Sequence, residues 1–96
     1  MTPTEPDILE EVETETRSHL SPPCNVIVHD DPITLMSYVT MTLRRIFGYS
    51  HEKAHTLMME VHTRGRSIVW TGASEQAETY VQMLHGAQLL ATLERA

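Results

Sequence analysis

The nine residues Val28-His29-Asp30-Asp31-Pro32-Ile33-Thr34-Leu35-Met36 join the end of an apolar strand to the first turn of a helix through two adjacent carboxylates. The β-branched run at their amino end predicts a strand over residues 25–29. Apolar residues with a helical period predict a helix over residues 34–47. Asp31 or Thr34 is expected to cap this helix. Its apolar stripe, which we expect to face the core, consists of Leu35, Met36, Val39, Leu43, Ile46 and Phe47.

The rest of the chain alternates between helical and extended patterns. A helix over residues 50–64 is expected to begin with a capping serine and to end at Gly65. A strand over residues 66–71, a helix over residues 74–85 and a final strand over residues 89–93 follow. The order β-α-α-β-α-β predicts a single small α+β domain, in which a three-stranded sheet packs against three helices.

The net charge of −6 is concentrated at the amino end of the 96-residue chain. Residues 1–23 carry six carboxylates against one arginine, whereas residues 24–96 carry seven acids against six bases. The first segment has few large apolar residues, so it buries too little surface to offset its ordering entropy. We therefore predict a mobile, disordered acidic arm over residues 1–23 and a folded core domain over residues 24–96.

Composition excludes several classes of protein and site. The single cysteine, Cys24, excludes an internal disulfide and a zinc site built from cysteines. The nearly neutral core lacks the basic surface of a nucleic-acid binder. No apolar run approaches the roughly 18 residues of a membrane span, and the amino end has acids where a signal peptide has basic and apolar regions. We expect a cytoplasmic monomer that binds no nucleic acid, membrane, metal or cofactor.

Two adjacent carboxylates, Asp30 and Asp31, are more than one helix cap requires. Like charges held together are costly unless a cation meets them. Met58 and His62 add an apolar side chain and an imidazole on another helix, about one turn apart. Together they indicate a pocket for a positive charge attached to a hydrophobic group. The structural alternatives stay open, because acids before a helix often only cap it and a histidine beside an apolar face often lies at the core edge.

A metal site is a weaker alternative. His51 and His55 are spaced so that both could bind one metal ion, but the glutamate of the HExxH pattern is absent. Exposed surface histidines are the favoured interpretation, and a small metal-dependent enzyme built on these two and an acid is the alternative. No nucleophile motif or phosphate-binding loop accompanies the acids, so we expect the protein not to be an enzyme. Glu75, Glu78 and Tyr80 are expected on a solvated helix face.

Taken together, the motifs of residues 24–96 resemble the ClpS family, the adaptors that bring N-degron substrates to an AAA+ unfoldase of the Clp protease. Their order and spacing agree across the whole domain, and the Asp-Asp-Pro variant is most similar to the actinobacterial branch. The motifs are Val26-Ile27-Val28-His29-Asp30-Asp31, Met36-Ser37-Tyr38-Val39, Met58-Met59-Glu60-Val61-His62, Gly65, Ala77-Glu78-Thr79 and Leu89-Leu90-Ala91-Thr92-Leu93-Glu94.

The resemblance implies a site for the free α-amino group and the large apolar side chain of a substrate's first residue, typically Leu, Phe, Tyr or Trp. Asp31 would accept a hydrogen bond from the ammonium group, and His62 would contact the same group. Asp30 is assigned to this amino-group site as well, although the family has an asparagine there. Met36 would act as a gate against β-branched residues. The side-chain pocket would be lined by Thr34, Met36, Val39, Met58, Val61 and Leu89.

The resemblance also implies a partner, the amino-terminal domain of a Clp-family ATPase of the ClpA or ClpC type. Glu75 and Tyr80 would contribute to docking on this domain, and the acidic arm corresponds to an extension that takes part in delivery. We therefore expect a non-enzymatic adaptor that delivers N-degron substrates for ATP-dependent degradation. The alternative is a regulator that docks on the unfoldase and changes its choice of substrate without reading N-termini.

Overall fold

The computed structural model describes residues 22–96, so the predicted arm lies outside the described residues except for its last two prolines. The predicted order β-α-α-β-α-β is confirmed within this range. The elements are β1 (Cys24–His29), α2 (Met36–Phe47), α3 (His51–Arg64), β2 (Arg66–Gly72), α4 (Ser74–Gly86) and β3 (Ala91–Arg95).

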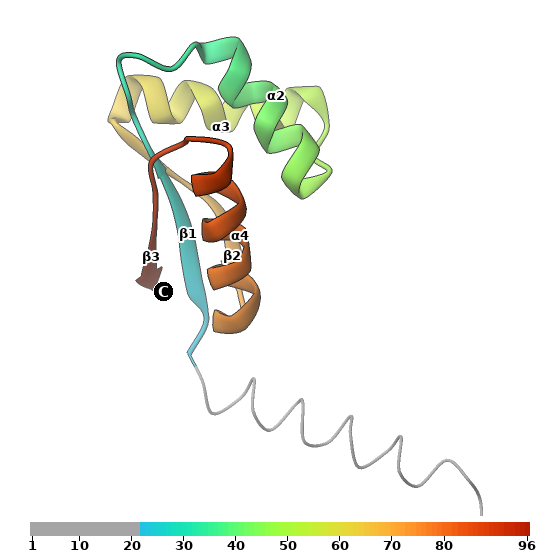
Figure 1. Ribbon diagram of the computed structural model, residues 1–96, viewed down its shortest axis with the longest axis vertical. Coiled ribbons are helices and arrows are strands. Elements are labelled where there is room, and N and C mark those ends of the chain that lie inside the picture. The colour runs from blue at the N-terminus through green and yellow to red at the C-terminus, as the bar shows by residue number, and fades with distance from the viewer. Residues whose placement is uncertain (1–21) are drawn as a thin grey trace, which may run out of the picture.

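The sheet is antiparallel with the strand order β2-β1-β3, so β1 is paired on both edges. Its β-branched residues Val26, Ile27 and Val28 are at most 1% exposed, as expected for the central strand. The pairing with β2 is irregular between Val26 and Ile27. Helix α4 runs beside the strands, while α2 and α3 lie across the far end of β1 (Figure 1).

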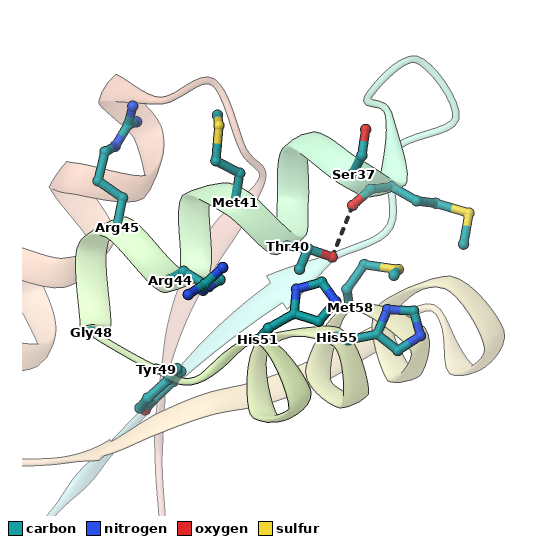
Figure 2. A pocket seen from close by; sticks show the side chains of 11 residues that line it. Ser37, Thr40, Met41, Arg44, Arg45, Gly48, Tyr49, His51, His55 and Met58 are labelled. Carbon is teal, nitrogen blue, oxygen red and sulfur yellow. Dashed lines mark hydrogen bonds between the residues drawn. The ribbon is translucent and has the colours of Figure 1, made fainter.

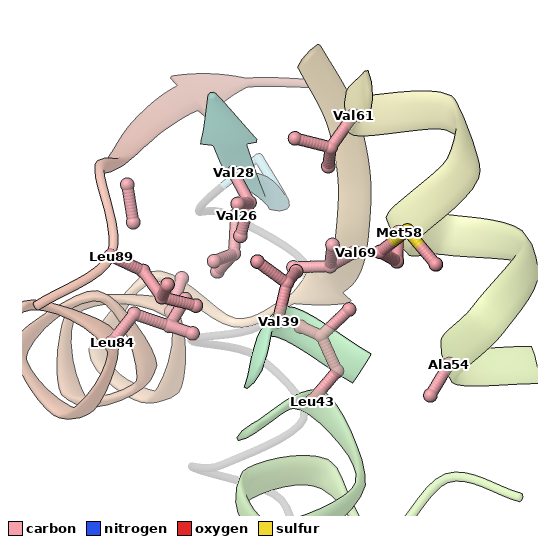
Figure 3. Close-up of a cluster of buried hydrophobic side chains, with 12 residues drawn as sticks. Val26, Val28, Val39, Leu43, Ala54, Met58, Val61, Val69, Leu84 and Leu89 are labelled. Carbon is pink, nitrogen blue, oxygen red and sulfur yellow. The ribbon is translucent and has the colours of Figure 1, made fainter. Parts of the chain in front are cut away.

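Helices and sheet share one apolar core (Figure 3). Full burial of a Val, Leu or Met side chain is worth about 1.5–3 kcal/mol, so this cluster is the main source of stability. Its members come from all three helices, from the strands and from the segment before β3. They are Val26, Val28, Val39, Leu43, Ala54, Met58, Val61, Val69, Ala77, Leu84, Leu89 and Ala91.

The ends of α3 agree with the prediction. Ser50 Oγ accepts a hydrogen bond from Lys53 N at 3.1 Å, which caps the first turn. Gly65 ends the helix in the left-handed conformation, with φ of 86°, and its N–H donates to Val61 O at 2.9 Å. A residue with a Cβ is strained in this conformation, which explains why glycine stands at this turn.

The amino end of α2 differs from the prediction. Leu35, with extended backbone, is the N-cap, and no side chain caps the helix. Asp31, one of the two expected caps, uses its carboxylate earlier in the loop. Its Oδ1 accepts from Ile33 N at 2.9 Å, and its Oδ2 accepts from Thr34 Oγ1 at 3.4 Å. Because the helix begins at Met36, Leu35 lies outside it and is 72% exposed instead of facing the core.

Strand β3 begins at Ala91, later than predicted, because the preceding residues still cap α4. Leu89 N donates to Leu84 O at 3.0 Å, and Gln88 has a φ of 67°. Tyr38 of α2 fixes the same segment by donating its Oη to Ala87 O at 2.8 Å. Leu89 is therefore buried against the helices instead of pairing within the sheet.

An aromatic cluster joins the carboxyl end of α2 to β2 and α4. The ring of Tyr80 lies 4.6 Å from that of Phe47 and 4.8 Å from that of Trp70 between centroids. Phe47 also stacks on Tyr49, whose Oη donates to Val69 O at 2.7 Å. Tyr80 is thus half-buried, and its predicted place on a solvated face is wrong, because its ring fills the space between α2 and β2.

Two glycines of this chain should respond in opposite ways to alanine. Gly65→Ala places a Cβ on a left-handed residue and should lower the free energy of unfolding by about 1–2 kcal/mol. Gly86→Ala lies in α4, where nothing beyond the neighbouring helix backbone comes within 4 Å of the new Cβ, and should be neutral or slightly stabilising. Urea unfolding of both variants checks this, and equal destabilisation would contradict it.

Tyr49 makes the stability of the protein depend on pH in the alkaline range. Burial, and to a lesser extent the neighbouring Tyr80, raises the pKa of Tyr49 above its ordinary value of 10.0, so the folded state favours the neutral phenol. This contribution is complete below pH 10 and is lost as the pH rises through the raised pKa. Tyr49→Phe should cost about 0.5–1.5 kcal/mol at neutral pH through the lost bond to Val69. Urea unfolding measures the difference in the free energy of unfolding between the natural protein and this variant. The difference should become smaller above pH 10, and a constant difference would refute the dependence of stability on the ionisation of Tyr49.

Candidate functional site

A pocket of about 590 Å³ lies at the carboxyl end of β1, where the loop before α2, the end of α3 and the segment before β3 meet. All nine residues that the sequence assigned to the amino-group site and the side-chain pocket line it. They are Asp30, Asp31, Thr34, Met36, Val39, Met58, Val61, His62 and Leu89. Three separate parts of the sequence therefore converge on one cavity.

Two backbone hydrogen bonds at the end of β1 hold these parts together. His29 N donates to Leu90 O at 2.9 Å, which ties the strand to the segment that carries Leu89. Asp30 N donates to Gly65 O at 2.9 Å, which ties it to the turn that follows α3. The acid pair thus begins where the central strand is held on both sides.

The floor of the pocket is apolar and buried. Val39 is 7% exposed, and Met58, Val61 and Leu89 are each 4% exposed. These four side chains also belong to the core, so each is packed from behind (Figure 3). A rigid apolar floor of this kind favours a hydrophobic group over a polar one.

The mouth of the pocket is polar. Asp30 and His62 are exposed, and Asp31 is half-buried. The oxygens of Asp31 already accept from Ile33 N and Thr34 Oγ1, but a carboxylate has about four lone-pair sites. Asp31 is therefore oriented by its own loop and can still accept hydrogen bonds from a cation.

An apolar rim stands between the floor and the mouth. Met36 is 39% exposed at the start of α2, and Thr34 beside it is half-buried. Leu35 and Leu90 also line the pocket, although they are 72% and 53% exposed, and the sequence did not assign either to it. The sequence placed Leu35 inside a helix and Leu90 inside a strand, whereas in the structure both lie between elements.

The two residues predicted for docking lie elsewhere. Glu75 is exposed in the first turn of α4, and Tyr80 on the same helix belongs to the aromatic cluster. Neither lines the pocket at the end of β1. The structure thus separates the predicted docking residues from the predicted substrate site.

The predicted histidine pair lies in a second cavity, the α2–α3 groove, which is lined by Met36, Ser37, Thr40, Met41, Arg44, Arg45, Gly48, Tyr49, His51, His55 and Met58. The rings of His51 and His55 stack with centroids 5.9 Å apart and point into this groove (Figure 2). Within residues 22–96 no group of three or more His, Cys, Asp or Glu side chains is arranged to hold a metal ion.

Over the same residues, none of the helices combines the length and the hydropathy that crossing a membrane requires.

Comparison with known proteins gives one consistent result. The family model of the ATP-dependent Clp protease adaptor protein ClpS matches residues 19–92. Two relatives carry the name ATP-dependent Clp protease adapter protein ClpS. The one from Streptomyces coelicolor is 51% identical over 73 residues, which cover 76% of each chain. The one from Corynebacterium efficiens is 44% identical over 92 residues, which cover 96% of this chain and 89% of the relative.

A solved structure is similar in fold. It is that of Agrobacterium tumefaciens ClpS2 bound to L-phenylalaninamide, with a TM-score of 0.74 at 23% sequence identity. The similarity covers 78% of this chain and 98% of that chain.

Substitution of Asp31 should separate its structural role from its charge. Asp31→Ala removes the acceptor for Ile33 N and should lower the free energy of unfolding by about 0.5–1.5 kcal/mol. Asp31→Asn keeps a carbonyl oxygen at the same place and should cost clearly less. Urea unfolding of both variants measures the difference, and equal losses would show that the loop does not depend on this hydrogen bond.

Proposed function

The chain belongs to the ClpS family of ATP-dependent Clp protease adaptors, and from this premise we propose that it binds the free N-terminal residue of N-degron substrates and delivers them to a Clp AAA+ unfoldase. An adaptor serves a protease and is not itself an enzyme. The proposed first residues are Leu, Phe, Tyr and Trp, whose side chains are large and apolar.

One observation carries this proposal. A single pocket combines carboxylates and an imidazole at its mouth with a floor of four buried apolar side chains. The N-terminal residue of a peptide has two groups that match these parts of the pocket. They are a cationic α-ammonium group and a side chain, both attached to the same α-carbon. An internal residue has the side chain but no ammonium, so it would leave the carboxylates without a partner.

The ammonium group would bind at Asp31. A hydrogen bond between an ammonium and a carboxylate is charge-assisted and about twice as strong as a neutral one. The loop bonds from Ile33 N and Thr34 Oγ1 hold the Asp31 carboxylate in place before the ligand arrives, which reduces the entropy lost on binding. His62 is proposed as a second contact, since a neutral imidazole has one acceptor nitrogen.

Asp30 is proposed to act through its charge. It is exposed at the mouth, and its backbone N–H is already bonded to Gly65 O. An exposed carboxylate near the ammonium adds an attraction that salt screens, whereas a direct bond to Asp31 is screened less.

The side chain of the first residue would occupy the apolar floor. Burial of a Leu or Phe side chain against Val39, Met58 and Val61 is worth about 1.5–3 kcal/mol. Met36, half-exposed beside Thr34, is proposed as the gate that disfavours side chains branched at Cβ. A flexible thioether can adapt to both aliphatic and aromatic side chains, which suits a pocket for several residue types.

The ligand of the similar structure supports this assignment of chemistry. Phenylalaninamide, bound by the Agrobacterium tumefaciens protein, has a free α-amino group and an aromatic side chain. These are the two groups that the pocket of this chain is proposed to take.

Delivery would use other parts of the chain. We propose the amino-terminal domain of a ClpA- or ClpC-type ATPase as the partner, with Glu75 and the half-buried Tyr80 on α4 as docking residues. Because neither residue lines the pocket, docking and substrate binding would then use separate surfaces. The division into an acidic arm over residues 1–23 and a core domain over residues 24–96 remains part of this proposal.

A peptide titration tests the proposal. Fluorescence anisotropy with a Leu- or Phe-initiated peptide should show saturable binding, and the N-acetylated form of the same peptide should bind at least about tenfold more weakly, a loss of 1.4 kcal/mol or more. Asp31→Asn should weaken binding of the free peptide by a similar factor, because the charge is lost while the loop is kept.

Asp30→Asn is the matched control, since it removes an equal charge from the adjacent residue. Its effect should be smaller and should fade as the salt concentration rises. Equal binding of free and acetylated peptides would refute recognition of the α-amino group and would favour a regulator that does not read N-termini.

A further inference from the structure

The α2–α3 groove is a second cavity, and most of the residues that line it have no part in the proposed function. Its volume is about 880 Å³, and it runs between the two helices from Tyr49 to Met36 and Met58. Arg44, His51 and His55 project into the space between the helices, and Met58 lies near its floor (Figure 2). The groove therefore combines cationic and imidazole groups with methionine side chains.

The charge of the groove is uncompensated within the described part of the chain. No aspartate or glutamate lines it. Within residues 22–96 the structure has one ion pair, between Arg66 and Glu94 on the sheet, at 2.7 Å. Arg44 and Arg45 therefore have no carboxylate partner among these residues. Lys53 lies 4.1 Å from the centre of the Tyr49 ring and adds another positive charge at the end of the groove.

The segment of residues 5–15 has the complementary composition. It carries Glu5, Asp7, Glu10, Glu11, Glu13 and Glu15 and no base, although the core is nearly neutral. Its apolar residues Ile8, Leu9 and Val12 match the apolar part of the groove, where Met41 is 49% exposed. We propose that this acidic segment of the same chain binds the α2–α3 groove.

The length of the chain permits this contact. Tyr49, at one end of the groove, donates to Val69 O, and Val69 lies opposite the irregularity between Val26 and Ile27. Four residue steps along the chain separate Val26 from Pro22, which is about 13 Å. Seven further residue steps lead from Pro22 back to Glu15 and span up to about 23 Å when extended, which exceeds the roughly 13 Å between Pro22 and Val26.

The groove itself is short enough for one segment. Eight residue steps of α2 separate Met36 from Arg44, a length of about 12 Å. Because the segment is tethered, its effective concentration near the groove is about millimolar, which favours it over free acidic peptides at low concentration. The groove shares Met36, Ser37 and Met58 with the pocket at the end of β1. Asp31 and His62 do not line the groove, so the bound segment would contact the shared residues beside that pocket and would leave Asp31 and His62 uncovered.

Competition with a free copy of the segment tests the proposal. The probe is a fluorescent peptide of residues 5–15 with an acetylated amino end, which cannot use a site for free N-termini. A full-length variant with Glu5→Gln, Asp7→Asn, Glu10→Gln, Glu11→Gln, Glu13→Gln and Glu15→Gln leaves the groove open. At low ionic strength the probe should bind this variant at least about tenfold more tightly than it binds the natural chain.

Groove variants identify the binding surface. Adding Arg44→Gln and Arg45→Gln to the neutralised chain should abolish binding of the probe. The matched double control is Arg64→Gln with Arg95→Gln, which removes the same charge from exposed positions outside the groove and should leave binding nearly unchanged. Thermal unfolding of each variant shows that the fold is kept, as expected for exposed side chains.

Several outcomes would overturn the proposal. Equal binding of the probe to the natural and neutralised chains would show that the segment does not occupy the groove. If the two double arginine variants lost equal affinity for the probe, the probe would be attracted by net charge alone and not by the groove. A second probe has the same composition, but Ile8, Leu9 and Val12 are moved to one end. If it bound as tightly as the first probe, any acidic peptide would be enough for binding.

Discussion

Backbone hydrogen bonding along both edges of β1 is the constraint on which the rest of the structure depends. Pairing with β2 and β3 makes β1 central, so Val26 and Val28 belong to the core and Ile27 between them is fully buried. Bonds at the end of β1 extend this pairing to residues just before β3 and β2, because His29 N donates to Leu90 O and Asp30 N donates to Gly65 O. The loop that carries Asp31 therefore leaves the sheet from a fixed point.

The pocket is a consequence of this fixed end. The turn at Gly65 positions the end of α3, and the bond from Tyr38 Oη to Ala87 O positions the segment that carries Leu89. The floor of the pocket is simply the edge of the core, so its shape is maintained by the packing that stabilises the protein. The polar mouth costs little, because Asp30 and His62 remain exposed to water. Stability and recognition are thus compatible at neighbouring residues.

The chain separates its charges from its core. The described domain is nearly neutral and the acids are concentrated near the amino end, whereas the α2–α3 groove holds arginines without carboxylate partners among residues 22–96. The aromatic cluster of Phe47, Tyr49 and Tyr80 closes the other end of the α2–α3 pair. The helix pair therefore has a pocket at one end, packed rings at the other and a basic groove between them.

The sequence by itself determined the order of the elements, because β-branched runs, helical periods and capping residues such as Ser50 and Gly65 act over short distances. It also indicated the residues of the candidate site. The resemblance to a family then divided these residues into an amino-group site and a side-chain pocket. Local patterns misplaced the start of α2, the start of β3 and the environment of Tyr80. Asp31 can bond within its own loop or cap a helix, and Tyr80 turns inward only because Phe47 and Trp70 leave space for its ring. Such choices between equivalent local partners depend on residues distant in the chain, so only the tertiary structure decided them.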